Sequence, residues 1–186
     1  MYFDSFPKIL YDSKGNGEVK IVTNLLKRVA VRTKIKTNAL ILDTYNVKNG
    51  ETPESIADKL YDDPQLHWVV LLVNDITDRY HDWPMMEQQF NTYVNEKYDN
   101  PDGVHHYEIS QESGDTTKKI EVYNPELLTD AGAVSDSTAY GSATTVTNRE
   151  YEEQQQDQKR KIKLLDPRYI EQFVDEFETL IGESVI

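Results

Sequence analysis

The sequence predicts an α+β fold organised around a central β-α-α-β unit. Three observations predict this fold: a strand pattern at 44–47 precedes two helix starts in close succession, both helices carry apolar residues at helical spacing, and further strand patterns follow at 104–123 and 162–165. A chain of 186 residues can bury one sizeable core and carry extensions. We therefore expect one main core rather than two large domains.

Composition and charge exclude several classes of function. The formal net charge of −13 would repel a phosphate backbone, and no basic stripe alternates with aromatic residues, so we expect no nucleic-acid binding. The same charge disfavours an anionic membrane surface. The absence of cysteine excludes disulfides, thiolate nucleophiles and cysteine-ligated zinc. Because the N-terminus lacks a signal-like segment and no apolar stretch is long enough to cross a bilayer, we expect no membrane association and assembly in a cytoplasm.

Residues 1–42 are expected to form an N-terminal arm. Apolar residues are spread through it, and a basic run follows from Lys27 to Lys36. Gly15-Asn16-Gly17 lacks the lysine and hydroxyl residue of a phosphate-binding loop and is predicted to be a turn. Two interpretations stay open: the arm packs on the core as short strands and a turn of helix, or it docks on a partner protein.

The central unit is expected to begin with the strand pattern at 44–47 and a turn at 48–51. Thr52 is placed to cap the next helix, and Pro53 suits its first position because proline lacks the amide hydrogen that would be unpaired there. The apolar residues that follow share one helix face: Ile56, Ala57, Leu60 and Tyr61.

A second helix is expected after Asp63 and Pro64, which repeat the cap and proline signal. The segment Asn74–Asp78 is then predicted to turn into a short edge strand that closes the unit. A third helix is expected to open at 82–84 and to carry its apolar residues on one side: Met86, Phe90, Tyr93 and Val94. We assign 43–100 to the central domain with this extra helix.

The remaining chain is expected to form three further parts. Residues 101–128 contain two strand-like runs around a turn signal and are predicted to form a β-hairpin flap. Residues 129–158 are predicted to be a flexible polar loop, because Ser, Thr, Ala, Gly and Asp dominate its first part. Residues 159–186 are predicted to form a strand and a helix, the latter starting at Asp166-Pro167 with one broad apolar face.

No residue cluster in the sequence indicates catalysis or metal binding. The four histidines are His67, His81, His105 and His106, and adjacent residues on a regular strand point to opposite faces. Neighbouring carboxylates such as Asp62 and Asp63 are expected by chance among 33 acidic residues, so they do not indicate a general acid/base pair. We expect no enzyme activity, no cofactor and no metal.

The segment from Tyr45-Asn46-Val47 through Gly50-Glu51-Thr52-Pro53 to Leu72-Val73-Asn74 resembles the LysM module. This resemblance implies a β-α-α-β fold with a sugar-binding groove between the loops at 48–52 and 74–78. The chain lacks the glycine and Ile-Pro ending of a typical LysM, and its second loop carries two carboxylates. Because of the resemblance, peptidoglycan binding, as a module of a phage or bacterial lytic system, is kept as the alternative function.

A wider set of motifs resembles the baseplate wedge proteins of large contractile-tailed bacteriophages, and it runs over nearly the whole chain. The motifs are Phe3…Phe6-Pro7, Pro64-Gln65-Leu66-His67-Trp68-Val69, Asp82-Trp83-Pro84, Val104-His105-His106-Tyr107 and Lys159–Pro167. This resemblance implies a structural virion protein of the tail baseplate, assembled in the host cytoplasm, that joins neighbouring wedge subunits. Its partners would be other wedge proteins and neighbouring wedges.

The sequence contains more aromatic side chains than a small core can bury, and some of them are expected to contact those partner proteins. The predicted interaction surface consists of Tyr45, Gly50, Thr52, Asn74, Asp75, Trp83, Tyr93, Arg160 and Phe177.

Overall fold

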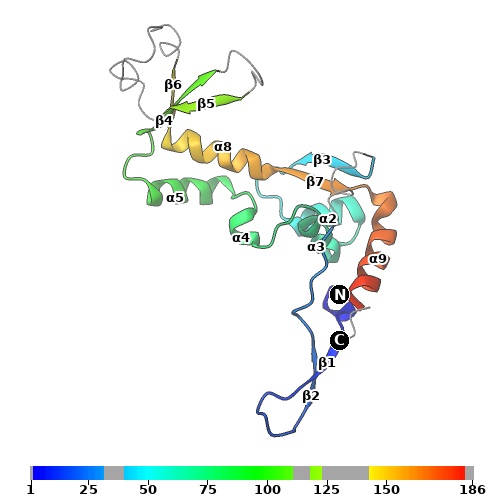
Figure 1. The fold of residues 1–186 in the computed structure, drawn as a ribbon. Coiled ribbons are helices and arrows are strands. Elements are labelled where there is room, and N and C mark those ends of the chain that lie inside the picture. The colour runs from blue at the N-terminus through cyan, green and yellow to red at the C-terminus, as the bar shows by residue number, and fades with distance from the viewer. Residues whose placement is uncertain (1, 32–39, 111–117, 123–142, 183–186) are drawn as a thin grey trace. The chain divides into compact units, whose positions relative to one another are not determined.

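The computed structural model describes residues 2–31, 40–110, 118–122 and 143–182 (Figure 1). Short strands in small sheets and helices alternate along these residues, which confirms the α+β prediction. The three hydrophobic clusters of buried residues combine side chains from the helices, from the strands and from the N-terminal segment.

The chain forms two compact units. The first holds residues 1–84 and 159–186, and the second holds residues 85–158. The second unit is thus inserted in the sequence of the first. The sequence alone suggested extensions where this second unit forms.

The elements of both units follow in chain order. The first unit contains η1 (Tyr2–Ser5), β1 (Lys8–Tyr11), β2 (Lys20–Thr23), β3 (Leu42–Asn46), α2 (Pro53–Tyr61), η2 (Pro64–Leu66), α3 (His67–Val73), α4 (Arg79–Asp82), β7 (Lys161–Leu165), η3 (Pro167–Tyr169) and α9 (Ile170–Gly182). The second contains α5 (Glu87–Lys97), β4 (Val104–Ser110), β5 (Lys119–Val122), β6 (Thr144–Thr147) and most of α8 (Asn148–Arg160).

The β-α-α-β unit is closed by a strand from the far end of the chain. β3 pairs antiparallel with β7, so that Leu42 lies opposite Leu165. The prediction of a closing strand within 74–78 is wrong, since this segment is a turn in which the Ile76 amide donates to the Leu71 carbonyl at 3.0 Å. The second strand of the β-α-α-β unit therefore comes from the C-terminal segment, after the inserted unit.

The predicted start of α2 is confirmed by its hydrogen bonds. The Thr52 hydroxyl accepts from the Ser55 amide at 3.2 Å, while the Ser55 hydroxyl accepts from the Thr52 amide at 2.9 Å, which forms a reciprocal capping box. Ile56 and Ala57 are buried as expected. They join the first hydrophobic cluster, whose buried members are Val47, Ile56, Ala57, Val70, Trp83, Ile162 and Leu164.

The second helix also begins where the sequence predicts. The Asp63 carboxylate accepts from the Gln65 amide at 2.8 Å, and the first turn, η2, is a 3-10 helix that leads into α3. Val69 and Val73 pack with Leu42 and Leu165 in the second cluster. Because β3 and β7 residues belong to both clusters, α2 and α3 form one core with the two-stranded sheet.

Helix α9 adds a third cluster, made of Phe6, Phe177 and Ile181. The 3-10 turn η3, which leads into α9, is capped by the Asp166 carboxylate, which accepts from the Arg168 amide at 2.9 Å. The Arg168 guanidinium beside this carboxylate lowers the pKa of Asp166 to about 2. The broad apolar face predicted for this helix is confirmed.

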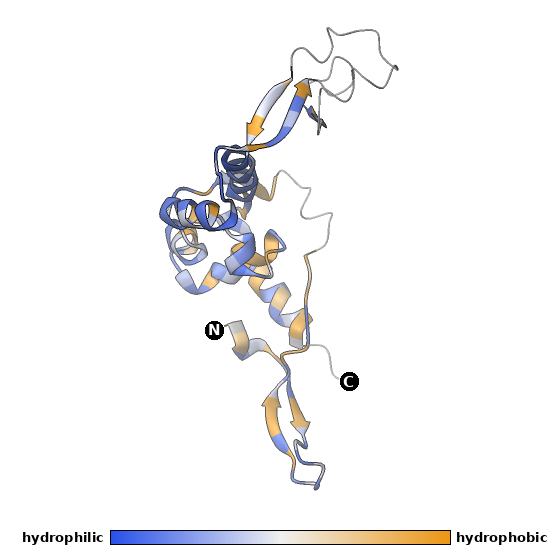
Figure 2. Cartoon of the chain, turned by 90° about the vertical axis from the view of Figure 1, so that its left-hand side faces the viewer, coloured by the Kyte–Doolittle hydropathy of each residue, from blue (hydrophilic) through white to orange (hydrophobic). Residues whose placement is uncertain are grey.

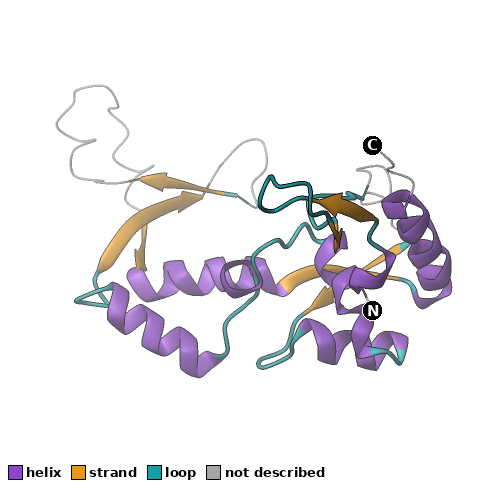
Figure 3. Cartoon of the chain, turned by 90° about the horizontal axis from the view of Figure 1, so that it is seen from below, coloured by secondary structure: helices purple, strands orange, loops and turns teal. Residues whose placement is uncertain are grey.

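In the second unit, α5 and α8 lie side by side (Figures 1 and 3), linked by a hydrogen bond from the Arg149 guanidinium to the Asn91 amide oxygen at 2.9 Å. The sheet order is β5-β4-β6, which confirms the predicted hairpin of β4 and β5. Helix α5 begins at Glu87, later than the predicted opening at 82–84.

The polar-loop prediction for 129–158 is wrong where the structure describes the chain. Residues 129–142 lie outside the described residues, but β6 and α8 occupy 144–160. The start of α8 is a capping box, because the Thr147 hydroxyl accepts from the Glu150 amide and the Glu150 carboxylate accepts from the Thr147 amide at 2.8 Å. The spacing of a hydroxyl residue and a glutamate three residues later was the sequence signal for this helix.

Candidate docking surfaces

The β1–β2 hairpin exposes more large apolar side chains than any other segment of the described chain. Of the fourteen exposed large hydrophobic residues among those described, six lie between Leu10 and Leu26, four on the hairpin and two directly after β2. Both strands are largely orange in Figure 2, which marks hydrophobic residues. Those six residues are Leu10, Tyr11, Val19, Ile21, Leu25 and Leu26.

The hairpin has a well-defined turn. The Asp12 carboxylate accepts from the Gly15 amide at 2.7 Å and the Gly17 amide at 2.8 Å. Both glycines have positive φ values, of 68° and 83°, which favour glycine at these positions. Hydrogen bonds from the Gly17 amide and its neighbours lower the pKa of Asp12 below its ordinary value. The predicted turn at 15–17 is confirmed.

The base of the arm is attached to α9. The Ser5 hydroxyl donates to the Glu178 carboxylate at 2.9 Å, and the Lys27 ammonium donates to the Leu180 carbonyl at 2.7 Å. Phe6 is buried against Phe177. The interpretation that the arm packs on the core is therefore confirmed for its base. The strands of its hairpin leave apolar side chains in solvent, and docking of the arm on a partner stays a prediction.

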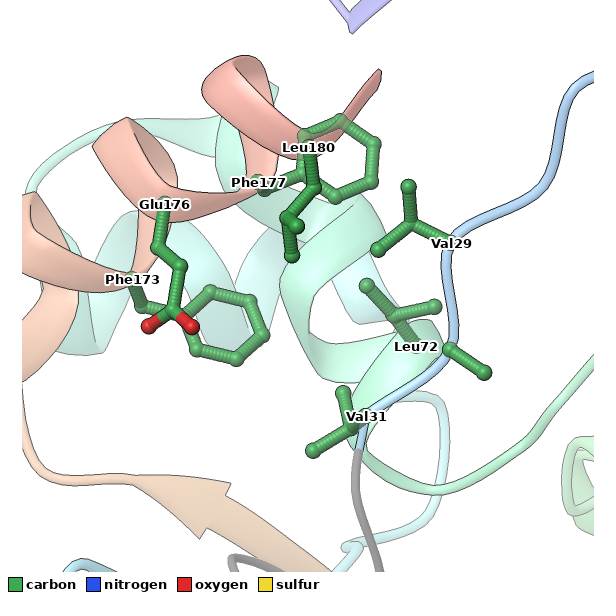
Figure 4. Close-up of a pocket in the computed structure, with 8 residues that line it drawn as sticks. Val29, Val31, Leu72, Phe173, Glu176, Phe177 and Leu180 are labelled. Carbon is green, nitrogen blue, oxygen red and sulfur yellow. The ribbon is translucent and has the colours of Figure 1, made fainter. Parts of the chain in front are cut away.

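An apolar pocket lies between this arm and α9. Figure 4 shows side chains from both segments, and Leu72 of α3, pointing into it. Glu176 is the acidic residue among its lining side chains. The full lining is Val29, Ala30, Val31, Leu72, Phe173, Glu176, Phe177 and Leu180.

The loop that carries Gly50 and Thr52 is fixed by a hydrogen bond to strand β3. Gly50 has a φ of 81°, and the Tyr45 hydroxyl is hydrogen bonded to the Glu51 carboxylate at 2.9 Å. Burial raises the pKa of Glu51, but hydrogen bonds from the Lys48 amide and Tyr45, with the charge of Lys59, outweigh it and leave that pKa below its ordinary value. Tyr45 thus connects strand β3 to this turn.

Trp83 and Phe177 lie in the core, which does not agree with their predicted place on a partner-facing surface. Trp83 is 7% exposed and Phe177 is 4% exposed. The Trp83 indole donates to the Glu51 carbonyl at 2.9 Å, and the Phe177 ring lies 4.4 Å from that of Trp68. A large aromatic ring that closes a small core is stabilised by burial, which explains both positions.

Asn74 joins α3 to β7. Its side-chain amide donates to the Val70 and Lys163 carbonyls, both at 2.8 Å, and its side-chain oxygen accepts from the Lys163 amide at 2.8 Å. The amide group therefore pairs with Lys163 as a neighbouring strand would. Asp75 next to it is exposed and has a positive φ of 56°.

Replacing Asn74 with alanine is expected to lower the free energy of unfolding by about 2 kcal/mol, because the paired groups of Lys163 and Val70 lose their partner. Urea unfolding followed by tryptophan fluorescence measures this, since both tryptophans, Trp68 and Trp83, lie in the first unit. Thr77→Ala, at an exposed position in the same loop, is the matched control and should leave the midpoint unchanged. Equal midpoints for the two variants would contradict this role of Asn74.

The two remaining predicted surface residues are partly buried. The Tyr93 hydroxyl accepts from the Lys97 ammonium at 2.9 Å in the second unit. Arg160 lies at the end of α8, and its backbone carbonyl accepts from the Val47 amide at 2.9 Å. Five of the nine predicted residues belong to the loops and strands around the β3–β7 sheet: Tyr45, Gly50, Thr52, Asn74 and Asp75.

Sequence reasoning missed a buried polar cluster in the second unit. Glu152 is 5% exposed, and its carboxylate accepts from the Lys97 ammonium at 2.6 Å and the Tyr98 hydroxyl at 2.8 Å. Burial raises the pKa of Glu152, but these two hydrogen bonds outweigh it and leave that pKa below its ordinary value. Every group here is paired with another side chain of the cluster, so its role is structural.

The prediction that the two adjacent histidines of β4 point to opposite faces is wrong. Their Nδ1 atoms are 2.8 Å apart, and the His105 ring stacks on Tyr151 at 3.9 Å. The register of β4 against β6 shifts between Val104 and His106, which is the mark of a β-bulge. A bulge adds one residue to a strand and so changes which face a side chain takes.

Within the described residues, no three His, Cys, Asp or Glu side chains are grouped so that they could hold a metal ion. None of the helices in this described part of the chain has the length and apolar character needed to span a bilayer.

Comparison with known proteins covers nearly the whole chain. Residues 1–180 match the family model described as "Base plate wedge protein 53". The chain is also 26% identical over 191 residues to the baseplate wedge protein gp53 of Enterobacteria phage T4. This alignment covers 99% of this chain and 97% of that protein. On the strength of a match that extends over both units, the chain belongs to the base plate wedge protein 53 family of bacteriophage tails.

Proposed function

We propose that this baseplate wedge protein is a non-enzymatic structural subunit that joins neighbouring wedges during baseplate assembly. The observation that carries the proposal is the apolar β1–β2 hairpin, whose side chains remain in solvent although its base is fixed to α9. Contiguous exposed apolar residues are typical of protein-protein contacts. A hairpin of this kind supplies an attachment point separate from the core.

Two further regions are proposed to contact wedge proteins. One is the exposed part of the β-α-α-β unit around Gly50, Thr52 and Asp75, with Tyr45 and Arg160 at the adjoining sheet. The other is the C-terminal segment 159–186, which lines the apolar pocket through α9. Tyr93 offers a partly buried ring in the second unit.

The peptidoglycan alternative is supported neither by the family nor by the phage T4 relative. In the first of the two loops that would border a sugar groove, the Glu51 carbonyl is already bonded to Trp83, and in the second the Asn74 side chain is bonded to Lys163. The resemblance to LysM stays a prediction.

Reconstitution of the baseplate tests the proposal. Purified wedge complexes of the same phage that lack this chain are mixed with it, and their association is followed by sedimentation velocity. We expect closed rings of wedges in its presence and separate wedges in its absence. An unrelated protein of similar size and net charge serves as the control, and rings that form equally well with that control would overturn the proposal.

A further inference from the structure

We propose that the β1–β2 hairpin binds an extended segment of another baseplate protein as an added β-strand, and that this segment carries carboxylates beside apolar side chains. The inference rests on the proposed function, since it specifies the partner chemistry of one of the proposed contacts. Three properties of the arm lead to it: the outward-facing backbone groups at the edges of its hairpin, the exposed apolar pair on that hairpin, and the excess of basic residues in the arm as a whole.

The edges of the hairpin carry backbone groups aimed away from the partner strand. The Asn24 amide donates to the Pro7 carbonyl at 2.8 Å, which fixes the phase of the antiparallel ladder. Hydrogen-bonded and non-hydrogen-bonded pairs alternate in such a ladder, so Leu10 and Ile21, which lie opposite each other, form a non-hydrogen-bonded pair. Their N–H and C=O groups therefore point outward, where an added strand would pair with them.

The side chains of the same pair are available to a partner. Leu10 is 69% exposed and Ile21 is 70% exposed, and they lie on one face of the hairpin. A two-stranded hairpin alone is marginally stable in water, and a third strand that covers apolar side chains supplies what it lacks. Addition of a strand at either edge would bury one member of the Leu10–Ile21 pair more deeply.

The charge of the arm favours a partner segment that carries carboxylates. The hairpin itself, residues 8–23, contains three lysines and two acidic residues, and residues 24–36 of the arm add five Lys or Arg and no acidic residue, in a chain whose formal net charge is −13. Lys8 and Lys20 are exposed at the ends of their strands. Lysines on an edge strand disfavour pairing between two copies of the same hairpin, and they attract a strand that carries carboxylates. The overall charge of −13 also makes two copies of the chain repel each other.

The test uses the full chain and the purified wedge complex of the same phage. Hydrogen exchange with residue resolution is compared for the free chain and the complex, and we expect the Leu10 or the Ile21 amide to exchange about tenfold or more slowly in the complex. The double variant Leu10→Ser with Ile21→Ser should bind the wedge at least about tenfold more weakly. Leu40→Ser, at a leucine that is 80% exposed outside the hairpin, is the matched control and should bind as wild type.

The carboxylate part of the inference has its own readout. Lys8→Glu with Lys20→Glu should weaken binding most at low ionic strength, and the difference from wild type should shrink as salt is added. Equal salt dependence of the variant and the wild-type chain overturns this part.

The remaining outcomes separate the inference from the proposed function. If the serine variant binds as wild type and both amides remain unprotected in the complex, strand addition is wrong while wedge joining stands. A hairpin-dependent dimer of the free chain would assign the surface to a second copy and overturn the inference. If the wild-type chain does not enter the wedge at all, both the inference and the proposed function fail.

Discussion

Replacing Leu165 with alanine is expected to lower the free energy of unfolding of the first unit by about 3–4 kcal/mol. Leu165 is 2% exposed, lies opposite Leu42 in the β3–β7 sheet, and packs with Val69 and Val73. Removing a buried leucine loses its transfer free energy and leaves a cavity, which together account for a loss of this size. Urea unfolding followed by tryptophan fluorescence measures the change, since both tryptophans lie in the first unit.

Leu40→Ala is the control for that measurement. Leu40 is 80% exposed, and the substitution should change the free energy of unfolding by less than about 0.5 kcal/mol. A Leu165 variant as stable as the Leu40 variant would show that β7 is not part of the core. That result would also remove the C-terminal strand from the β-α-α-β unit.

Replacing Glu152 with alanine is expected to destabilise the second unit by about 3 kcal/mol. The change removes two charge-assisted hydrogen bonds of a carboxylate that is itself buried, and it leaves the Tyr98 hydroxyl and the Lys97 ammonium, whose side chain is 42% exposed, without that partner. Hydrogen exchange of peptides from α5 and β4 measures the loss, which corresponds to roughly a hundredfold faster exchange through opening of the unit. Glu153→Ala, at the exposed next position of α8, should leave exchange unchanged.

The same pair of variants predicts a dependence on pH. In the folded chain the pKa of Glu152 lies below its ordinary value of 4.5, so its contribution to stability is fully present above that value. The contribution is lost as the pH falls through the lowered pKa of the folded state. The difference in exchange between wild type and Glu152→Ala should therefore shrink below pH 4.5, whereas a constant difference would contradict the role given to this carboxylate.

The sequence was sufficient to predict the helix starts because their signals are local. Thr52, Asp63 and Asp166 each cap the helix or helical turn that begins with the following proline, and each accepts a backbone amide within a few residues. Such caps depend only on neighbouring residues. The start of α8 carried the same kind of signal at Thr147 and Glu150, so this helix was predictable from the sequence.

Features that depend on distant residues could not be read from local patterns. The pairing of β3 with β7 and the bonds from Asn74 to Lys163 join positions 89 or more residues apart. The register shift near His105 arises from pairing with β6, which lies beyond residues 129–142. Trp83 is buried in the first cluster with its indole bonded to the Glu51 carbonyl, a contact that no spacing rule predicts.

The candidate surface changed for a related reason. An excess of aromatic residues suggested a partner for Trp83 and Phe177, but the core of the first unit takes up both rings. The largest group of exposed apolar side chains lies on the hairpin and directly after it, where short strands leave little protein to cover them.

The most direct test of the joining role is a cryo-electron microscopy reconstruction of the baseplate of the phage that encodes this chain. We predict density for the chain at the contact between neighbouring wedges. The β1–β2 hairpin should contact a different baseplate protein and not a second copy of this chain. Density for the chain confined to the interior of one wedge, with no contact to the next, would contradict the account.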